Sequence, residues 1–81
     1  MNAIDEAVIL ARLRADMASG RAREVRVAAR LSQADVAAAV GVDQTAIANW
    51  EAGRKKPRRG EAAIRYAELL RKLADITREA S

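Results

Sequence analysis

Residues 31–53 read LSQADVAAAVGVDQTAIANWEAG, and this stretch decides the fold. Ser32 is suited to cap a helix N-terminus, and Asp35 stands three residues later, where its carboxylate can return a hydrogen bond to the cap. The helix has to stop at Gly41, because glycine readily takes the left-handed conformation that follows helix ends. The sequence therefore predicts a short helix between Ser32 and Gly41.

A second short helix follows with almost no linker. Asp43 is placed to cap its N-terminus, and the helix is expected from Gln44 to about Ala52, before Gly53 ends it. Two short helices joined by a turn that contains glycine form a helix-turn-helix unit, in which the second helix enters the DNA major groove. The residues expected to face the core of this unit are Val36, Ala37, Val40, Val42, Ile47 and Trp50.

The opposite face of the second helix carries side chains that can read bases. At about 100° per residue, the arc away from the core holds Gln44, Thr45, Ala48 and Asn49. Glutamine and asparagine amides pair with the N6 and N7 atoms of adenine, and the methyl groups of threonine and alanine can contact a thymine methyl. The competing interpretation is a polar surface without a ligand. We expect these four residues to read bases.

The charge is distributed to suit a polyanion. The chain has a formal net charge of +4 and a pI near 10.3. Residues 21–31 carry +3 and residues 54–60 carry +5, whereas residues 32–53 between them carry −3. Two basic blocks around neutral amides separate phosphate attraction from base reading. The competing interpretation of the second block is a solvated turn, since Pro57 and Gly60 interrupt it.

The remaining chain also has helical periodicity. Helices are expected over residues 2–18, 21–30 and 61–77. The first has an apolar face too wide for one contact, so we expect one side to face its own domain and the other a second subunit. Its two stripes are Ile4, Val8, Ala11 and Ala15, and Ile9, Leu13 and Met17. The inward residues expected in the other two helices are Val25, Ala28 and Ala29, and Ala63, Tyr66, Leu69, Leu70, Leu73 and Ile76.

Composition favours an all-α fold. Hydrophobic residues make up 51% of the 81 residues but aromatic residues only 2%, so alanine does much of the packing. A chain of this length has room for one core. We expect a single domain over residues 1–81, a compact bundle of about five helices with a central helix-turn-helix at 33–52. An extra N-terminal helix lies within 1–19, and the C-terminal helix at 61–77 completes the bundle.

The residue types that most catalysis and metal binding require are missing. The sequence has no cysteine and no histidine. Asp5 and Glu6 are adjacent carboxylates, but adjacent helical positions point apart and no base accompanies them. We expect no enzymatic activity, no metal and no cofactor. With no long apolar run, we expect no membrane attachment and a cytoplasmic, nucleoid-associated protein, in the host cytoplasm if a phage encodes it.

The stretch that begins with LSQ at residues 31–33 and ends with WEAG at residues 50–53 resembles the helix-turn-helix of the Cro, lambda-repressor and XRE-type DNA-binding family. The resemblance covers roughly residues 21–75. The sequence departs from the family pattern in two places. Arg30 stands where the family usually has glycine before Leu-Ser-Gln, and the helix through Ala18 is an addition.

The resemblance also implies roles for particular residues. Gln33, at the start of the first motif helix, would contact a phosphate and support a base-reading neighbour. The base-reading positions that it implies are Gln44, Thr45 and Asn49. The positions that would lie along phosphates are Arg54, Lys55, Lys56 and Arg58. Arg26 and Glu51 correspond to a pair that often forms a structural ion pair in the family.

The predicted function is a sequence-specific, double-stranded-DNA-binding transcription regulator, a small Cro-type or phage-repressor-like protein that inserts the Gln44–Ala52 helix into the major groove. We expect a homodimer joined by the N-terminal or C-terminal helix. We expect no small-molecule effector, because 81 residues leave no room for an effector domain. One alternative is an XRE-type antitoxin that binds a toxin and its own promoter. Another is an adaptor that binds a protein partner.

Overall fold

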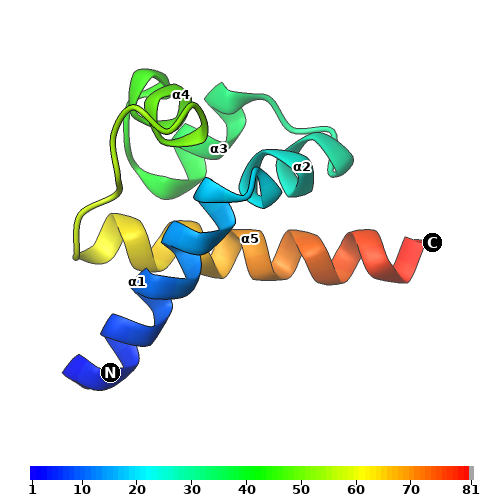
Figure 1. Ribbon diagram of the computed structural model, residues 1–81. Helices are drawn as coiled ribbons and strands as arrows, with labels where there is room; N and C mark the ends of the chain where they lie inside the picture. The colour runs from blue at the N-terminus through cyan, green and yellow to red at the C-terminus, as the bar shows by residue number, and fades with distance from the viewer. Residues whose placement is uncertain (81) are drawn as a thin grey trace.

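The computed structural model describes residues 1–80, which form five helices and no strand (Figure 1). The helices are α1 (Ala3–Ala18), α2 (Arg21–Ala28), α3 (Gln33–Val40), α4 (Gln44–Glu51) and α5 (Glu61–Ala80). In Figure 1, α5 runs along the base of the bundle, and the N-terminal end of α1 projects beyond it. α1, α2 and α3 each pack on α5, and α3 packs on α4. The predicted all-α bundle with a central helix-turn-helix is confirmed.

The core lies where α5 meets the other helices. Tyr66 and Leu70 of α5 are buried together with Leu13 of α1, Ala22 of α2 and Val36 of α3. The small core residues Ala22, Ala37 and Ala63 let the helices approach closely, which is how a chain with so few aromatic residues fills its interior. Among the described helices, none combines the length and the apolar character that a membrane span requires.

α2 and α4 end in the same hydrogen-bonded turn, but with different residues in the left-handed position. After α2, Arg30 has a φ of 60°, and the N–H of Leu31 donates to the Arg26 carbonyl at 3.2 Å. After α4, Gly53 has a φ of 76°, and the N–H of Arg54 donates to the Asn49 carbonyl at 2.9 Å. Arg30 is the one non-glycine residue with positive φ in residues 1–80. Its conformation costs about 1–2 kcal/mol relative to ordinary backbone.

Some sequence-based placements are wrong. Ala28 is exposed, and Ala22 is the buried alanine of α2, because this helix packs through its first turn and ends at residue 28. α5 continues to Ala80 rather than ending near Thr77. Its last turns run past the other helices (Figure 1), so Ile76 is 59% exposed instead of facing the core.

Candidate nucleic-acid interface

The start of α3 is fixed by the capping box that its sequence predicts. The N–H of Asp35 donates to Ser32 Oγ, and the N–H of Ser32 donates to Asp35 Oδ2, both at 2.9 Å. The hydrogen bonds from the Ser32 backbone and then from its side chain hold the pKa of Asp35 below its usual value. Two N–H groups at the helix start are satisfied in this way, so α3 begins at a defined residue, Gln33.

The turn between α3 and α4 favours glycine through its backbone conformation. Gly41 has a φ of 85°, and its N–H donates to the Ala37 carbonyl at 2.8 Å. Arg65 of α5 reaches the same turn, where its Nη1 atom lies 3.4 Å from the Val40 carbonyl oxygen. A Cβ atom at Gly41 would lie 3.3 Å from that Nη1 atom, which is closer than most Cβ contacts. The positive φ favours glycine at the turn, whereas the half-exposed Arg65 side chain can shift to admit a Cβ atom.

The rotation of α4 is set by two core contacts. Ile47 is fully buried, and the Trp50 ring stacks on Tyr66 with centroids 5.6 Å apart. Trp50 is therefore half-buried against the core, as its position on the Ile47 face predicts, and its ring stacks on Tyr66 instead of on a base. Burial, together with the nearby Glu51 carboxylate, raises the pKa of Tyr66. The Tyr66 hydroxyl has no hydrogen-bond partner among residues 1–80.

This rotation turns the predicted base-reading residues to the outer face of α4. Gln44 and Thr45 are exposed at its first turn, and Ala48 and Asn49 are half-buried one turn later. Within residues 1–80, the side chains of Gln44, Thr45 and Asn49 make no hydrogen bond, so their polar groups remain available to a ligand. Asp43 occupies the predicted N-cap position, but its side chain does not bond to the helix start.

A buried ion pair joins the end of α4 to α2. Arg26 Nε donates to Glu51 Oε2 at 2.6 Å, and Arg26 Nη2 donates to Glu51 Oε1 at 2.8 Å. Only 11% of the Arg26 side chain and 3% of the Glu51 side chain are exposed. Arg26 Nη1 also donates to the Leu31 carbonyl at 2.9 Å. The bidentate geometry fixes the distance between α2 and α4 as well as compensating both charges.

Gln33 belongs to this network. Its Nε2 atom donates to Glu51 Oε1 at 3.1 Å. Burial alone would raise the pKa of Glu51, but the hydrogen bonds from Arg26 and Gln33 and the positive charge of Arg26 outweigh it, so this pKa lies below its usual value. The amide of Gln33 is thereby oriented by Glu51. Its second N–H remains as the donor for the phosphate contact that the resemblance implies.

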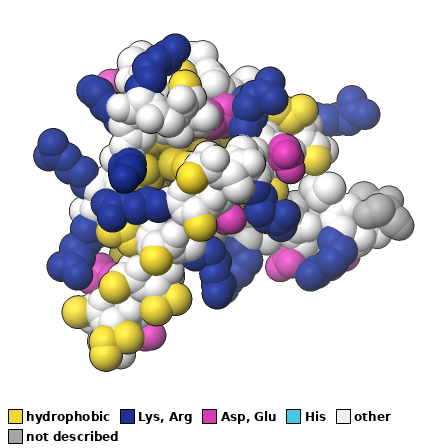
Figure 2. Space-filling view, viewed as in Figure 1, with side chains coloured by type: hydrophobic (Ala, Val, Ile, Leu, Met, Phe, Trp, Pro, Cys, Tyr) yellow, Lys and Arg dark blue, Asp and Glu magenta, His cyan; other side chains and the backbone are white. Residues whose placement is uncertain are grey.

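The basic segment between α4 and α5 is anchored at one residue, and all of its cations are exposed. Pro57 is fully buried, and Arg14 Nη2 of α1 donates to its carbonyl at 3.3 Å. The exposed cations of the segment are Arg54, Lys55, Lys56, Arg58 and Arg59. None of these five forms an ion pair with a described residue. Figure 2 shows lysine and arginine side chains projecting around the end of the molecule that carries α4.

A family model described as Helix-turn-helix matches residues 23–78. The chain belongs to this helix-turn-helix family, of the Cro, lambda-repressor and XRE type. The matched residues run from α2 to α5 and exclude α1, which agrees with the interpretation of the N-terminal helix as an addition. Comparison with curated proteins and with solved structures gives no match. Membership of the family supports a DNA-binding regulator.

In this helix-turn-helix protein, tertiary structure adds positioning residues that sequence reasoning missed. Arg65 of α5 contacts the turn at the Val40 carbonyl, and the bond from Arg14 to the Pro57 carbonyl holds the basic segment against α1. Neither arginine stands out in the sequence, since each is one of many cations on a helix. Pro57 was identified only as an interruption of the basic segment. The burial of a single proline leaves no periodic pattern in the sequence, so the sequence does not reveal it.

Proposed function

We propose that the protein is a sequence-specific transcription regulator that places α4 in the major groove of duplex DNA. The observation that carries this proposal is the outer face of α4, where amide groups without internal partners lie on the helix that leads into the exposed cations of residues 54–59. The rotation of α4 is fixed by Ile47 and Trp50, and its far end by Glu51. A rigidly held helix with free amides is suited to distinguish base edges in the major groove.

The proposed mode of binding divides the work between two sets of residues. Gln44, Thr45, Ala48 and Asn49 contact bases. Gln33 and the segment cations Arg54, Lys55, Lys56 and Arg58 contact phosphates, which supplies affinity without sequence preference. Family membership and the exposure of the segment cations support this division. As a Cro-type repressor, the protein would bind as a homodimer to an inverted repeat with half-sites about 34–36 Å apart and block the promoter by occupying it.

A second candidate function is an antitoxin, and the exposed apolar face of α1 favours it. Ile4 is 76% exposed and Val8 is 53% exposed on a helix outside the matched family region. A toxin bound to that face would leave α4 available for the promoter. A toxin-like reading frame next to the gene, whose product co-purifies with this chain, would support this candidate over a Cro-type repressor.

The test is selection from a random duplex library at near-physiological salt, followed by sequencing of the retained pool. An enriched inverted repeat supports a dimeric sequence-specific regulator and gives the half-site spacing. Retention without any enrichment contradicts sequence specificity.

The selected site then tests the residues on α4. We expect Gln44→Ala with Asn49→Ala to weaken binding to the selected site by about 100-fold, because each lost bidentate contact costs about 1–3 kcal/mol. Binding to random duplex, measured in the same titration, should change by less than about threefold, since the phosphate contacts remain. Equal losses on both duplexes would contradict base reading by these amides. Unchanged binding to both would favour the protein-binding adaptor.

A further inference from the structure

One face of α1 carries an apolar seam that no described residue covers. The α1 seam consists of Ile4, Val8, Ala11, Ala15 and Ala18, all of them exposed. Leu13 and Met17, on the other side of the helix, are buried in the core. Figure 2 shows hydrophobic side chains gathered on the part of α1 that projects from the bundle. The two sides of this helix therefore have separate roles, and only one of them is filled by the chain itself.

The spacing of the α1 seam is that of a helix that packs along another helix. Its five residues are separated by 4, 3, 4 and 3 positions, which is the heptad pattern of apolar residues in a coiled coil. Single exposed apolar residues are ordinary on protein surfaces, but a continuous seam at this spacing is not. Side-chain size also changes along it, from Ile4 and Val8 in the first half to alanine in the second.

We propose that α1 pairs in an antiparallel orientation with α1 of a second copy of this chain. In the register that aligns the two seams, Ile4 lies opposite the partner's Ala15, and Val8 lies opposite the partner's Ala11. Each large side chain then meets a small one, so the helices approach at an even distance along the seam. A parallel pair would place Ile4 against its own counterpart and alanine against alanine, which holds the helices apart at one end.

Charges beside the α1 seam select the same orientation. Asp5 and Arg12 flank the seam on one side, and both are exposed. Neither side chain has an ion-pair partner among residues 1–80. In the antiparallel register Asp5 lies beside the partner's Arg12, and two-fold symmetry repeats the pair. In a parallel pair, the partner's residue nearest to Asp5 would be Ala7 or a residue that precedes the helix. Neither is a lysine or an arginine, so Asp5 gains no ion-pair partner.

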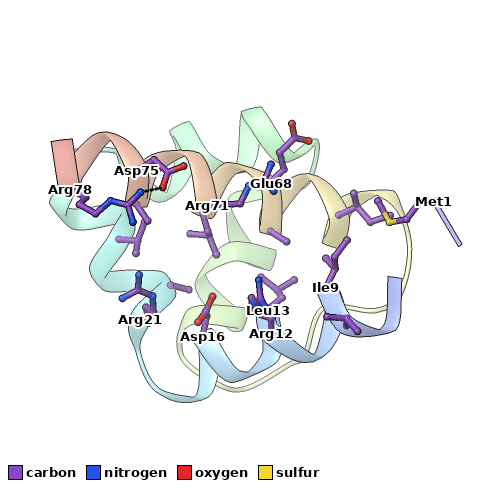
Figure 3. Close-up of a pocket in the computed structure, with 17 residues that line it drawn as sticks. Met1, Ile9, Arg12, Leu13, Asp16, Arg21, Glu68, Arg71, Asp75 and Arg78 are labelled. Atoms are coloured by element: carbon purple, nitrogen blue, oxygen red, sulfur yellow. Dashed lines mark hydrogen bonds and ion pairs between the residues drawn. The ribbon is translucent and has the colours of Figure 1, made fainter. Parts of the chain in front are cut away.

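A neighbouring groove offers the competing place for a second helix. α1, α2 and α5 line an open groove of about 440 Å³, which shares Val8 with the α1 seam and Arg12 with its flank. Figure 3 shows Arg12 and Leu13 of α1 on one side and Arg71 and Glu68 of α5 on the other. Shape and charge along the α1 seam specify a register for a second copy of the same helix. No residue of the seam or the groove belongs to α3, α4 or residues 54–59, so pairing leaves the proposed DNA-binding face open.

The size of the contact sets its strength. α1 has 16 residues and is about 24 Å long. An interface along one helix of this length falls at the small end of specific protein contacts, below about 1,200 Å² in total. The dimer should therefore dissociate on dilution. Its formation does not depend on DNA binding, so it can be tested without DNA.

The first test reverses the flanking charges and measures dimerisation by sedimentation equilibrium over a range of concentrations. Asp5→Arg and Arg12→Asp should each weaken the dimer by about tenfold, because two attractive pairs become repulsive. An equimolar mixture of the two variants should dimerise as well as the wild type, since every pair across the mixed interface is again attractive. Helix content by circular dichroism checks that both variants remain folded.

The matched control is Arg71→Asp, which reverses a charge on the α5 wall of the groove, on another helix from the α1 seam. This variant should dimerise like the wild type. A monomeric wild type at every concentration would overturn the proposal. So would a loss of dimer in Arg71→Asp, or a mixture of the two α1 variants that fails to associate.

The second test fixes the orientation with cysteines, since the natural chain contains none. Ile4→Cys and Ala15→Cys are made as separate proteins. Under oxidising conditions a disulfide dimer should form in their mixture and not in either protein alone, because the antiparallel register places position 4 beside the partner's position 15. Efficient cross-linking of Ile4→Cys alone would show a parallel pair and overturn the proposal.

A third variant separates this proposal from the proposed function. Ala11→Glu places a charge in the middle of the α1 seam and should give a monomer. This monomer should bind a duplex with a single half-site as tightly as the wild-type protein binds that same duplex. If the wild-type protein binds no DNA but the mixed variants still associate, only the proposed function fails. If DNA is bound but the charge variants dimerise normally, only the α1 pairing fails.

Discussion

Two groups of charges in this protein lie three residues apart in the sequence and have opposite fates. Glu51, at the end of α4, is almost fully buried and accepts hydrogen bonds from Arg26 and Gln33. The cations that begin at Arg54 are exposed, and none has an ion-pair partner in the described chain. The first group is completed by the protein itself. The second is completed only by solvent or by an external anion.

This difference separates stability from binding. A buried charge pair is costly to desolvate, so removing one partner strands the other in a poorly solvated site. An exposed cation is already hydrated, and its removal costs the fold little. Substitutions in the Arg26–Glu51 network should therefore change stability. Substitutions in residues 54–58 should change affinity for DNA and leave stability almost unaltered.

The largest expected effect is that of Glu51→Ala. It leaves the Arg26 guanidinium without its carboxylate, and should lower the free energy of unfolding by about 3–5 kcal/mol, measured by urea denaturation. Glu68→Ala is the matched control, because it removes an exposed glutamate that pairs with Lys72 on α5. The control should cost less than about 1 kcal/mol. Similar costs for both variants would show that burial does not distinguish the two pairs.

A smaller effect is expected from Glu51→Gln, and it should depend on pH. The amide keeps the shape of the site but weakens its hydrogen bonds, at a cost of about 2 kcal/mol at pH 7. Because the pKa of Glu51 is lowered in the folded state, its contribution is fully present above its ordinary value of 4.5 and is lost as the pH falls below it. The stability difference between wild type and Glu51→Gln should therefore stay constant from pH 7 to about pH 5 and shrink as the pH falls from 4.5 to 3, each pH being measured by urea denaturation. A constant difference would contradict a lowered pKa.

The exposed group should give the opposite result. Lys55→Ala with Lys56→Ala should weaken binding to selected and random duplexes alike, by about tenfold at near-physiological salt. The slope of log affinity against log salt should become shallower by about two per subunit. The free energy of unfolding should stay within about 0.5 kcal/mol of wild type. Lys72→Ala, a lysine on α5, is the control and should leave the salt slope unchanged.

Arg30 extends the comparison to the backbone, because its side chain is exposed but its backbone is held in the left-handed conformation. Its left-handed conformation is one that glycine adopts freely, so Arg30→Gly should raise the free energy of unfolding by about 1 kcal/mol. Gly53→Ala, at the same place after α4, should lower it by a similar amount. Thermal unfolding measures both. A loss of stability in Arg30→Gly would show that the arginine side chain compensates for its backbone conformation.

The sequence predicted the parts of the site that depend on neighbours along the chain. The capping box of Ser32 and Asp35 and the turn at Gly41 are interactions over three or four residues, and the structure contains both. The arc of α4 that carries Gln44 follows from helix periodicity once Ile47 faces the core. Asp43 shows the limit of this approach, because its position is right and its expected side-chain bond is absent.

The identity of the family also followed from the sequence, since its motif lies in one continuous stretch. The paired Arg26 and Glu51 were anticipated through that resemblance, but no local rule links residues 25 positions apart. The exposure of Ile76 was missed for a related reason. Its place on the apolar stripe of α5 is correct, but only the lengths of the other helices decide how far the core extends along that stripe.

By itself, then, the sequence determined the all-α class, the two short helices with their turn, and the face of α4 that is free to contact bases. These features depend on backbone propensity, capping and periodicity, all of which act within a few residues. Only the tertiary structure decided that Gln33 bonds to Glu51, that Arg65 supports the turn, and that Arg14 holds the segment at Pro57. These contacts join residues 18, 25 and 43 positions apart, and they exist only because burial of the common core brings the helices together.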